Sequence, residues 1–355
     1  MKILVTPYKY SETAGGVEVF SESLQKIFPD LLMIVNSDVN LNLPTSCLFG
    51  NLLRNNDDIC SLLANKRVLK ITKNALVDVV FVNGVYGWYL TLKKVDVPTI
   101  NIFHGCYGGV ANHVLKSGKK LPFYYYKYHR GFMEYLSARG KRVVSVSQFV
   151  RDLLKQYYDI DSTVIPNGVD MKVFKAIEKY TARKVLGFPK NKKIGIFVGP
   201  LSYSKGFDII ARLAKKNPSL LFLVLSPKGD CDPNFPNIIP YTNISHLDMP
   251  NFYSVADFLI LPSRFEGCNL SALEAMACNV PILASETGSF HAMSGPQPFG
   301  YVVPLDSNVE AYQKAMYDIL MGDGFAPRSY VERYYSFDLF ENRYRKLVRS
   351  LTKST

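Results

Sequence analysis

The chain has 355 residues, of which 48% are hydrophobic and 20% are charged, and its formal net charge is +12. This length predicts two domains of the usual size, about 150 residues each, and this apolar content excludes a disordered chain. No apolar run approaches the roughly 18 residues of a membrane span, and the apolar run after Lys2 is too short for a signal peptide. We therefore expect a cytoplasmic protein, which could bind at the cytoplasmic face of the membrane.

Short apolar runs alternate with helical patterns along the whole chain, for example the helical spacing of residues 17–28 and 207–216. The runs lack apolar–polar alternation, which is typical of strands buried on both faces of a parallel sheet. Two such series predict an α/β protein with two Rossmann-like domains. The expected strands are 2–6, 31–35, 78–82, 99–103 and 142–146 in the first series, and 193–199, 220–225, 257–262 and 280–285 in the second.

The expected domain boundary follows residues 164–170, where Asn167 and Gly168 form a turn signal. We therefore expect an N-terminal domain at 1–170 and a C-terminal domain at 171–335. Residues 336–351 form an amphipathic helix with apolar residues at spacings of three and four. The apolar positions are Phe337, Phe340, Tyr344, Leu347 and Leu351.

The six cysteines are scattered, with no C-x-x-C pair and no Cys/His cluster of zinc-like spacing. Neither a disulfide scaffold nor a structural metal is expected.

A candidate site for an anion follows the strand at 257–262. Gly267 lets the backbone approach a ligand, and Asn269 is a good N-cap for a helix. The N–H groups of Cys268, Asn269 and Leu270 would then form a cradle for a phosphate at the helix N-terminus. The carboxylates of Glu266 and Glu274 flank the cradle and can accept hydrogen bonds from sugar and ribose hydroxyls, an order of groups that matches a nucleoside-diphosphate sugar.

Three further segments carry weaker signals for ligand binding. Lys205 and Gly206 follow the strand at 193–199, where a cation would face the ligand crevice of an open α/β sheet. Gly15 and Gly16 lie between the first strand and its helix, and a plain tight turn there is the alternative. His104 follows the strand at 99–103 beside glycines, and it is either a ligand contact or a structural histidine.

These pieces together resemble the retaining glycosyltransferases of family 4, which have the GT-B fold, and the resemblance covers nearly the whole chain. It implies two domains facing across a cleft and a C-terminal helix, 336–355, that crosses back to complete the first domain. The motifs that carry it are Gly15-Gly16-Val17, His104-Gly105, VSQFVRDLL (146–154), VIPNGVD (164–170), KGFD (205–208), YSVADFLILPS (253–263), Glu266 with Glu274, and EAMACNVPILAS (274–285).

The resemblance also implies roles for single residues. Glu266 corresponds to the glutamate beside the donor hexose, Glu274 to the glutamate that holds the ribose, and Lys205 to the lysine on the diphosphate. The family usually has an arginine five residues before that lysine, but Pro200 occupies this position here. Arg264, in the neighbouring loop, is one candidate to replace the missing cation.

The residues around 116–155 are unusually basic, with ten Lys or Arg and two acidic residues, Glu134 and Asp152. Many aromatic residues are interleaved with these charges. The ordinary interpretation is a solvated helix face over an aromatic core. The functional interpretation is peripheral contact with an anionic membrane or an acidic acceptor. Nucleic acid is not expected as a partner, because no recognition motif accompanies the charge.

We therefore expect a retaining, metal-independent glycosyltransferase without a cofactor. It would move a sugar from a UDP- or GDP-sugar to a hydroxyl of a glycan, glycolipid or lipid-linked acceptor, with Glu266, Lys205 and His104 as the catalytic candidates. The alternatives are a nucleotide-sugar epimerase or isomerase of the same shape, and a degenerate scaffold that only binds. Two D-x-D patterns, Asp159/Asp161 and Asp230/Asp232, match the metal motif of GT-A enzymes but arise easily by chance.

Overall fold

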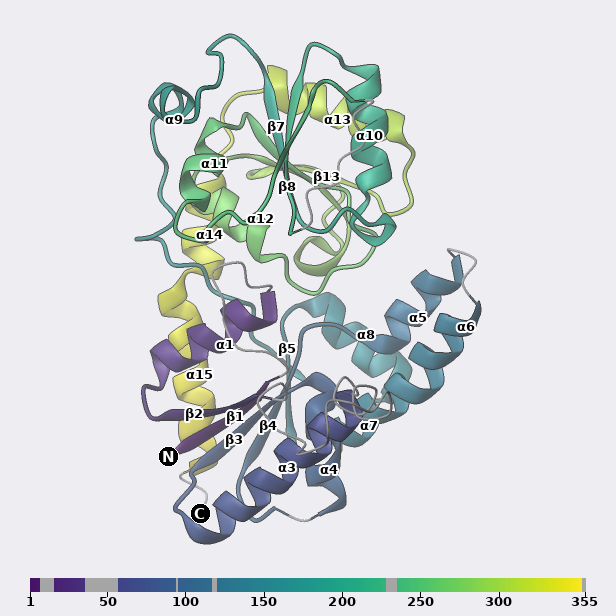
Figure 1. Cartoon of the computed structure of the whole chain (residues 1–355), viewed down its shortest axis with the longest axis vertical. Coiled ribbons are helices and arrows are strands. Elements are labelled where there is room, and N and C mark those ends of the chain that lie inside the picture. Colours follow the sequence, from purple (N-terminus) through teal and green to yellow (C-terminus); the bar gives the residue numbers. More distant parts are fainter. Residues whose placement is uncertain (7–15, 36–56, 94, 117–119, 228–234, 353–355) are drawn as a thin grey trace, which may run out of the picture. The chain divides into compact units, whose positions relative to one another are not determined.

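The computed structural model describes residues 1–6, 16–35, 57–93, 95–116, 120–227 and 235–352. The chain divides into two compact units, Met1–Ile165 with Glu341–Thr355, and Pro166–Phe340. The division falls inside the 164–170 segment, five residues before the end of the expected N-terminal domain. Figure 1 shows the elements of both units.

The first unit is built on a six-stranded parallel sheet in the order β2-β1-β3-β4-β5-β6. Every residue of β3 is buried, as the unbroken apolar run predicts. The strands are β1 (Lys2–Thr6), β2 (Leu31–Val35), β3 (Val79–Asn83), β4 (Thr99–Phe103), β5 (Arg142–Ser145) and β6 (Thr163–Val164). The helices are α1 (Gly16–Ile27), α3 (Asp57–Asn74), η2 (Gly84–Gly87), α4 (Trp88–Leu92), α5 (Tyr107–Lys116), α6 (Lys120–Tyr124), η3 (Tyr125–Arg130), α7 (Gly131–Ala138) and α8 (Gln148–Tyr158).

The second unit is built on a seven-stranded sheet in the order β12-β13-β11-β10-β7-β8-β9. All neighbouring pairs are parallel except β12 with β13. The strands are β7 (Ile194–Val198), β8 (Leu221–Leu225), β9 (Ile238–Tyr241), β10 (Phe258–Leu261), β11 (Ile282–Ser285), β12 (Gly295–Gln297) and β13 (Gly300–Val303). The helices are α9 (Lys179–Leu186), η4 (Tyr203–Lys205), α10 (Phe207–Lys216), α11 (Met249–Val255), α12 (Leu270–Ala277), η5 (Gly288–Phe290), α13 (Val309–Met321) and α14 (Pro327–Tyr335).

All nine expected strands are present, and the described part of the chain contains four further strands that the sequence pattern did not predict. β6 has only two residues, and β9 contains Pro240, which a strand pattern disfavours. β12 and β13 are short and each begins with a glycine, and β12 also contains Pro296. Three of the four, β6, β9 and β12, lie at the edge of a sheet, where strands are weakly specified by burial.

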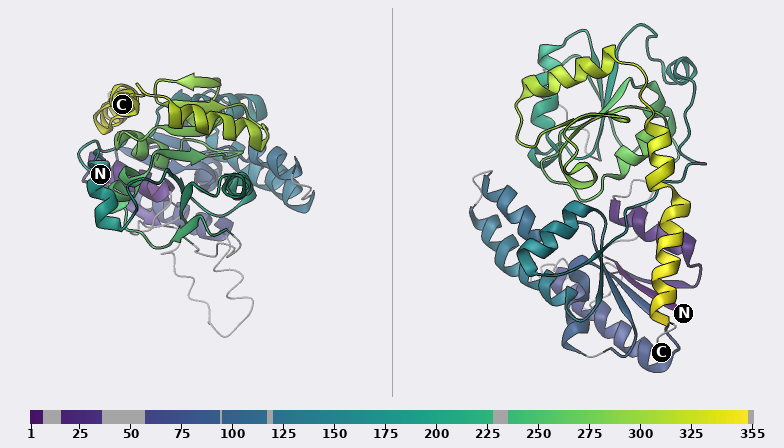
Figure 2. Two further views of the ribbon diagram at one scale, coloured as in Figure 1. Left: turned by 90° about the horizontal axis from the view of Figure 1, so that it is seen from above. Right: turned by 180° about the vertical axis from the view of Figure 1, so that it is seen from behind.

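The last helix, α15 (Phe337–Thr352), begins one residue after its expected start. Its residues from Glu341 onward belong to the first unit, where the Tyr344 ring packs edge-on against Phe20. Arg345 donates to the carbonyl of Ile27 at 2.8 Å. Figure 2 shows this helix along the sheet of the first unit. The buried stripe passes through Val348 rather than the expected Leu347, which is only half-buried.

A close approach of two loops in the second unit depends on Gly206. Its φ is +73°, and a Cβ there would lie 2.0 Å from the carbonyl oxygen of Pro262. Only glycine permits this conformation and this contact together. The loop after β7 is therefore held against the end of β10.

Candidate functional site

The carboxyl ends of β7 and β10 are neighbours, since the two strands pair in parallel. Lys205 ends η4, in the loop after β7, and Glu266 lies in the loop after β10. The Lys205 ammonium Nζ lies 2.6 Å from Glu266 Oε1. Their side chains are 30% and 13% exposed, so the pair is reachable from solvent yet partly desolvated. The structure thus brings together two of the three expected catalytic residues.

Three donors converge on one oxygen of Glu266. Besides Lys205, the Ser263 hydroxyl donates to Oε1 at 2.8 Å, and Asn269 Nδ2 donates to it at 3.1 Å. Ser263 is almost fully buried. Among the described residues, no hydrogen bond to Oε2 is seen, so this oxygen keeps its lone pairs for a ligand. Sequence reasoning missed Ser263, although its place three residues before Glu266 could have suggested it.

Asn269 has a second contact, at the start of α12. Its Oδ1 accepts from the N–H of Ala272 at 3.1 Å, so Asn269 is the N-cap of α12, as its sequence position predicts. The N–H groups of the first helical turn have no acceptors within the helix. Gly267 lies buried just before this turn. Desolvation raises the pKa of the neighbouring Cys268 thiol, so this thiol stays neutral near pH 7.

Glu274 lies in α12, largely buried. Its Oε1 faces His246 Nε2 at 2.8 Å, and its Oε2 accepts from the Tyr253 hydroxyl at 2.8 Å. Both carboxylate oxygens are therefore oriented by protein groups. His246 is 25% exposed, in the loop after β9, and packs edge-on against Phe174. No pattern in the sequence marked His246 as a partner of Glu274, because the two are 28 residues apart.

Arg264, the candidate for the missing cation, is bound to other groups of the second unit. Its guanidinium forms a two-pronged ion pair with Asp208, at 2.6 and 2.8 Å, and also donates to the carbonyl of Tyr203. The hydrogen bond to Asp208 raises the pKa of Arg264. The charge of Arg264 is thus compensated within the protein, which disfavours this residue as the candidate replacement for the missing arginine.

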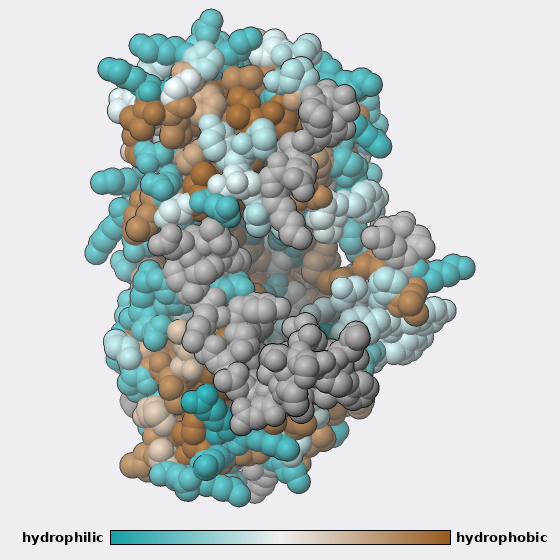
Figure 3. Space-filling model, viewed as in Figure 1, coloured by the Kyte–Doolittle hydropathy of each residue, from teal (hydrophilic) through white to brown (hydrophobic). Residues whose placement is uncertain are grey.

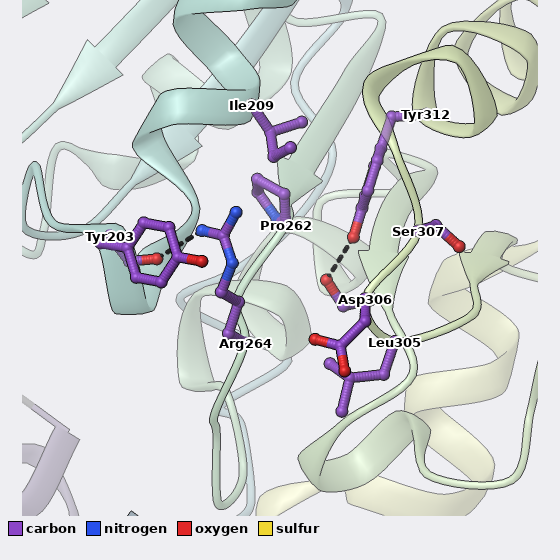
Figure 4. Close-up of a pocket in the computed structure, with 9 residues that line it drawn as sticks. Tyr203, Ile209, Pro262, Arg264, Leu305, Asp306, Ser307 and Tyr312 are labelled. Atoms are coloured by element: carbon purple, nitrogen blue, oxygen red, sulfur yellow. Dashed lines mark hydrogen bonds between the residues drawn. The ribbon is translucent and has the colours of Figure 1, made fainter. Parts of the chain in front are cut away.

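Arg264 instead lines a pocket of about 130 Å³ beside the start of α10. Figure 4 shows the guanidinium beside the Tyr203 ring and Tyr312 across the pocket. The Tyr312 hydroxyl forms a hydrogen bond of 2.7 Å with the Ser285 hydroxyl.

In the first unit, polar groups gather where β1, β3 and β4 end. Asn83 Nδ2 donates to Thr6 Oγ1 at 3.2 Å and to Ser21 Oγ at 3.4 Å, and Asn83 Oδ1 faces His104 Nε2 at 3.2 Å. The sheet order reverses between β1 and β3, which is where open α/β sheets bind ligands.

The same contacts define the state of His104. Because Asn83 Oδ1 is an acceptor, the proton of a neutral His104 is assigned to Nε2, and Nδ1 is left as an acceptor. Burial lowers the pKa of His104 to about 4, so the ring is neutral near pH 7. Gly16 is exposed at the start of α1, and Gly15 lies outside the described residues.

Neither D-x-D pattern forms a metal site in the described structure. Asp159 and Asp161 are exposed and pair with Lys155, at 2.7 and 3.3 Å. Asp230 and Asp232 lie outside the described residues. Within the described ranges, no group of three or more His, Cys, Asp or Glu side chains could hold a metal ion. None of the helices described has the length and hydropathy of a membrane span.

Comparison with known protein families gives two matches along the chain. Residues 48–173 match the sequence model described as Glycosyltransferase Family 4, and residues 192–321 match Glycosyl transferases group 1. Together the two matches account for well over half of the chain.

Curated relatives are similar at modest identity. A D-inositol 3-phosphate glycosyltransferase of Segniliparus rotundus is 28% identical over 243 residues, which are 63% of this chain and 53% of the relative. A lipopolysaccharide core biosynthesis mannosyltransferase of Rhizobium meliloti is 29% identical over 199 residues, 50% of this chain and 55% of the relative. The matched part thus spans about half the length of these two relatives. A glycosyltransferase of Methanocaldococcus jannaschii is 24% identical over 81% of this chain and 80% of its own.

Solved structures share the fold over the whole chain. Sucrose-phosphate synthase from Thermosynechococcus elongatus has a TM-score of 0.80 at 17% identity, covering 100% of this chain and 99% of that one. An Anabaena protein in complex with UDP-glucose has a TM-score of 0.72 at 16% identity, covering 99% of this chain and 100% of that one.

Proposed function

This chain belongs to the family 4 glycosyltransferases and has the GT-B fold, and from that premise we propose that it transfers a sugar, with retention of anomeric configuration, from a nucleoside-diphosphate sugar to a hydroxyl acceptor. The observation that carries the proposal is the meeting of Lys205, Glu266 and the N-terminus of α12 at one edge of the second sheet. A structural neighbour that binds UDP-glucose supports the donor class.

The donor side works by charge stabilisation. The leaving group is a nucleoside diphosphate, whose negative charge grows as the glycosidic bond breaks. Lys205 and the first-turn N–H groups of α12 supply fixed positive charge and dipoles for that growth. Glu266 Oε2 accepts a hydrogen bond from a hydroxyl of the donor hexose, and Glu274 accepts hydrogen bonds from the ribose hydroxyls. These groups need no metal ion or cofactor, so the reaction is proposed to be metal-independent.

The acceptor side lies in the first unit, around His104. Its neutral ring offers Nδ1 as an acceptor for a hydroxyl hydrogen, and Asn83 holds the ring through Nε2. The acceptor hydroxyl attacks the anomeric carbon from the face that the diphosphate leaves, and the departing phosphate oxygen takes its proton. The proposed acceptor class is a glycan, glycolipid or lipid-linked sugar, which the name of the lipopolysaccharide-core relative supports.

The test is a transfer assay with radiolabelled UDP- and GDP-hexoses, with and without cell lipids and with EDTA present. We expect transfer that survives the chelator, with the donor's anomeric configuration kept in the product, as read by NMR. Lys205→Gln should abolish most of it, while Lys215→Gln, an exposed lysine on α10, should not.

Three other results would overturn the proposal. Donor isomerisation without an acceptor would indicate an epimerase, and binding without turnover would indicate a scaffold. Loss of transfer in EDTA that is restored by Mn²⁺ would contradict the metal-free mechanism.

A further inference from the structure

Residues 120–138 form one continuous helix in the first unit, made of α6, η3 and α7. At both junctions the backbone stays helical, with φ −62° and ψ −41° at Tyr124 and at Gly131. The middle segment is a wider π-helical stretch. Figure 1 shows α5 and α6 side by side at one end of this helix.

The polarity of this helix is inverted. Its exposed stripe is apolar and aromatic, and the five side chains are between 49% and 81% exposed. The members follow helical spacing: Leu121, Tyr124, Tyr125, Tyr128 and Phe132. We call these five residues the aromatic stripe. The opposite face buries Arg130 and Glu134, each only 3% exposed. A solvated helix of a globular protein has the reverse arrangement.

The buried polar face locks the helix in this orientation. Arg130 Nη1 donates to Asp58 at 3.0 Å, and its guanidinium lies over the Tyr107 ring. Glu134 accepts from the Tyr107 N–H and from the Tyr158 hydroxyl, both at 2.7 Å. Turning the aromatic stripe inward would break all of these contacts, so the stripe stays outside.

The helical segment that carries the stripe has basic side chains and no acidic side chain before Glu134. The carboxylate of Asp58 on α3 approaches this helix, where it contacts His129 and pairs with Arg130. No Asp or Glu occurs from residue 97 to 133. Lys120 and Lys127 are exposed beside the stripe, and Lys127 Nζ lies 5.3 Å from the Phe123 ring centroid. Figure 3 shows this end of the unit as pale teal side chains with isolated brown ones, rather than as a continuous apolar face.

Several of the basic side chains at 116–155 bind other groups of the protein and are less available to a partner. Arg130 forms an ion pair with Asp58, and Lys155 forms ion pairs with Asp159 and Asp161. Lys141 donates to Thr91 and to the carbonyl of Ser137. Of the exposed cations that the structure describes in this window, Lys120 and Lys127 lie beside the stripe, whereas Arg139, Arg142 and Arg151 follow it in the chain.

We propose that the aromatic stripe, with Lys120 and Lys127, docks on an anionic lipid bilayer. Tyrosine and phenylalanine rings enter the interfacial layer, where an apolar ring and a polar tip are both satisfied. The two lysines reach the lipid phosphates, and the negative charge of Asp58 is compensated by its ion pair with Arg130. This proposal is independent of sugar transfer, because binding needs neither donor nor acceptor.

The test is co-sedimentation of the full chain with vesicles of phosphatidylcholine alone or with phosphatidylglycerol. We expect binding to the acidic vesicles, which salt weakens, and little binding to the neutral ones. The Lys120→Glu/Lys127→Glu variant should lower the affinity at least about tenfold, since each lysine near the surface contributes about fivefold. Leu121→Ser/Phe132→Ser should lower it about tenfold, because less apolar surface is buried.

Matched controls lie elsewhere on the same unit. Lys66→Glu/Lys70→Glu on α3 and Leu76→Ser, which is 92% exposed, should leave binding unchanged. Circular dichroism and Tm should match the wild type in all variants. Equal binding to both vesicle types, equal loss in the α3 control, or binding to a single-stranded RNA probe in place of vesicles would overturn the proposal.

Discussion

Lys205 Nζ lies 2.6 Å from Glu266 Oε1, which joins two residues 61 positions apart into one ion pair at the candidate donor site. A nucleoside diphosphate would compete with Glu266 for this ammonium group. The Ser263 and Asn269 donors would still hold Oε1 after the lysine turned to the phosphate. A bound donor could therefore take Lys205 from Glu266, and Glu266 would still accept hydrogen bonds from Ser263 and Asn269.

Removing the lysine charge should impair transfer strongly. A charge-assisted hydrogen bond contributes about 1.5–3 kcal/mol, so Lys205→Gln should lower kcat/KM for the donor roughly ten- to a hundredfold. Because Lys205 and Glu266 touch, their effects should not add. Steady-state kinetics on Lys205→Gln, Glu266→Gln and the double variant will measure this coupling, and strict additivity would show that the pair does not act together.

Ser263 and Asn269 should act on Glu266 by positioning it. Ser263→Ala removes one donor to Oε1, and Asn269→Ser removes the other while keeping an N-cap for α12. Each should lower kcat several-fold, with a smaller change in donor KM. Asn269→Ala, which also loses the cap, should in addition lower stability by about 1 kcal/mol. If Asn269→Ser and Asn269→Ala have the same kinetics and the same Tm, the helix cap contributes nothing separate from the contact with Glu266.

The two glutamates should separate kinetically. If Glu274 binds the ribose as proposed, its contact is the same in the ground and transition states, so Glu274→Gln should raise KM and leave kcat largely intact. Glu266→Gln acts beside the breaking bond, so kcat should fall roughly ten- to a hundredfold. Initial rates with varied donor decide between the assignments, and the opposite pattern would reverse the two roles. Thermal denaturation is the control, since Glu274 also accepts from buried Tyr253.

The buried Glu134 should make stability depend on pH. Burial raises the pKa of Glu134 from 4.5 to about 8. The folded state therefore holds a proton that the unfolded state releases, and stability falls as pH rises from about 4.5 to 8. The slope from this group is on the order of 1.4 kcal/mol per pH unit within that window.

Glu134→Gln keeps the acceptor for Tyr107 and Tyr158 but cannot ionise. The variant should therefore match the wild type near pH 5 and exceed it near pH 8 in urea denaturation. A stability difference that does not change with pH would contradict the raised pKa of Glu134.

Much of the fold could be predicted from local sequence pattern. Unbroken apolar runs predicted nine of the strands that the structure describes, and most of these lie inside a sheet, because a strand buried on both faces needs apolar side chains at every position. The N-cap at Asn269 followed from the chemistry of its side chain, which needs only neighbours three residues away. The family 4 motifs at Glu266, Glu274 and Lys205 predicted the glycosyltransferase class.

Contacts between distant segments were decided only by the tertiary structure. The pairing of His246 with Glu274 and the capture of Arg264 by Asp208 join loops from different strands, and nothing in local spacing specifies them. The sequence at 116–155 does not show which basic and aromatic side chains are buried. In the folded unit Arg130 and Glu134 are buried, and the aromatic stripe is exposed. Sequence determines which groups a segment carries, whereas the free energy of packing and hydrogen bonding over the whole unit decides which of them remain available to a partner.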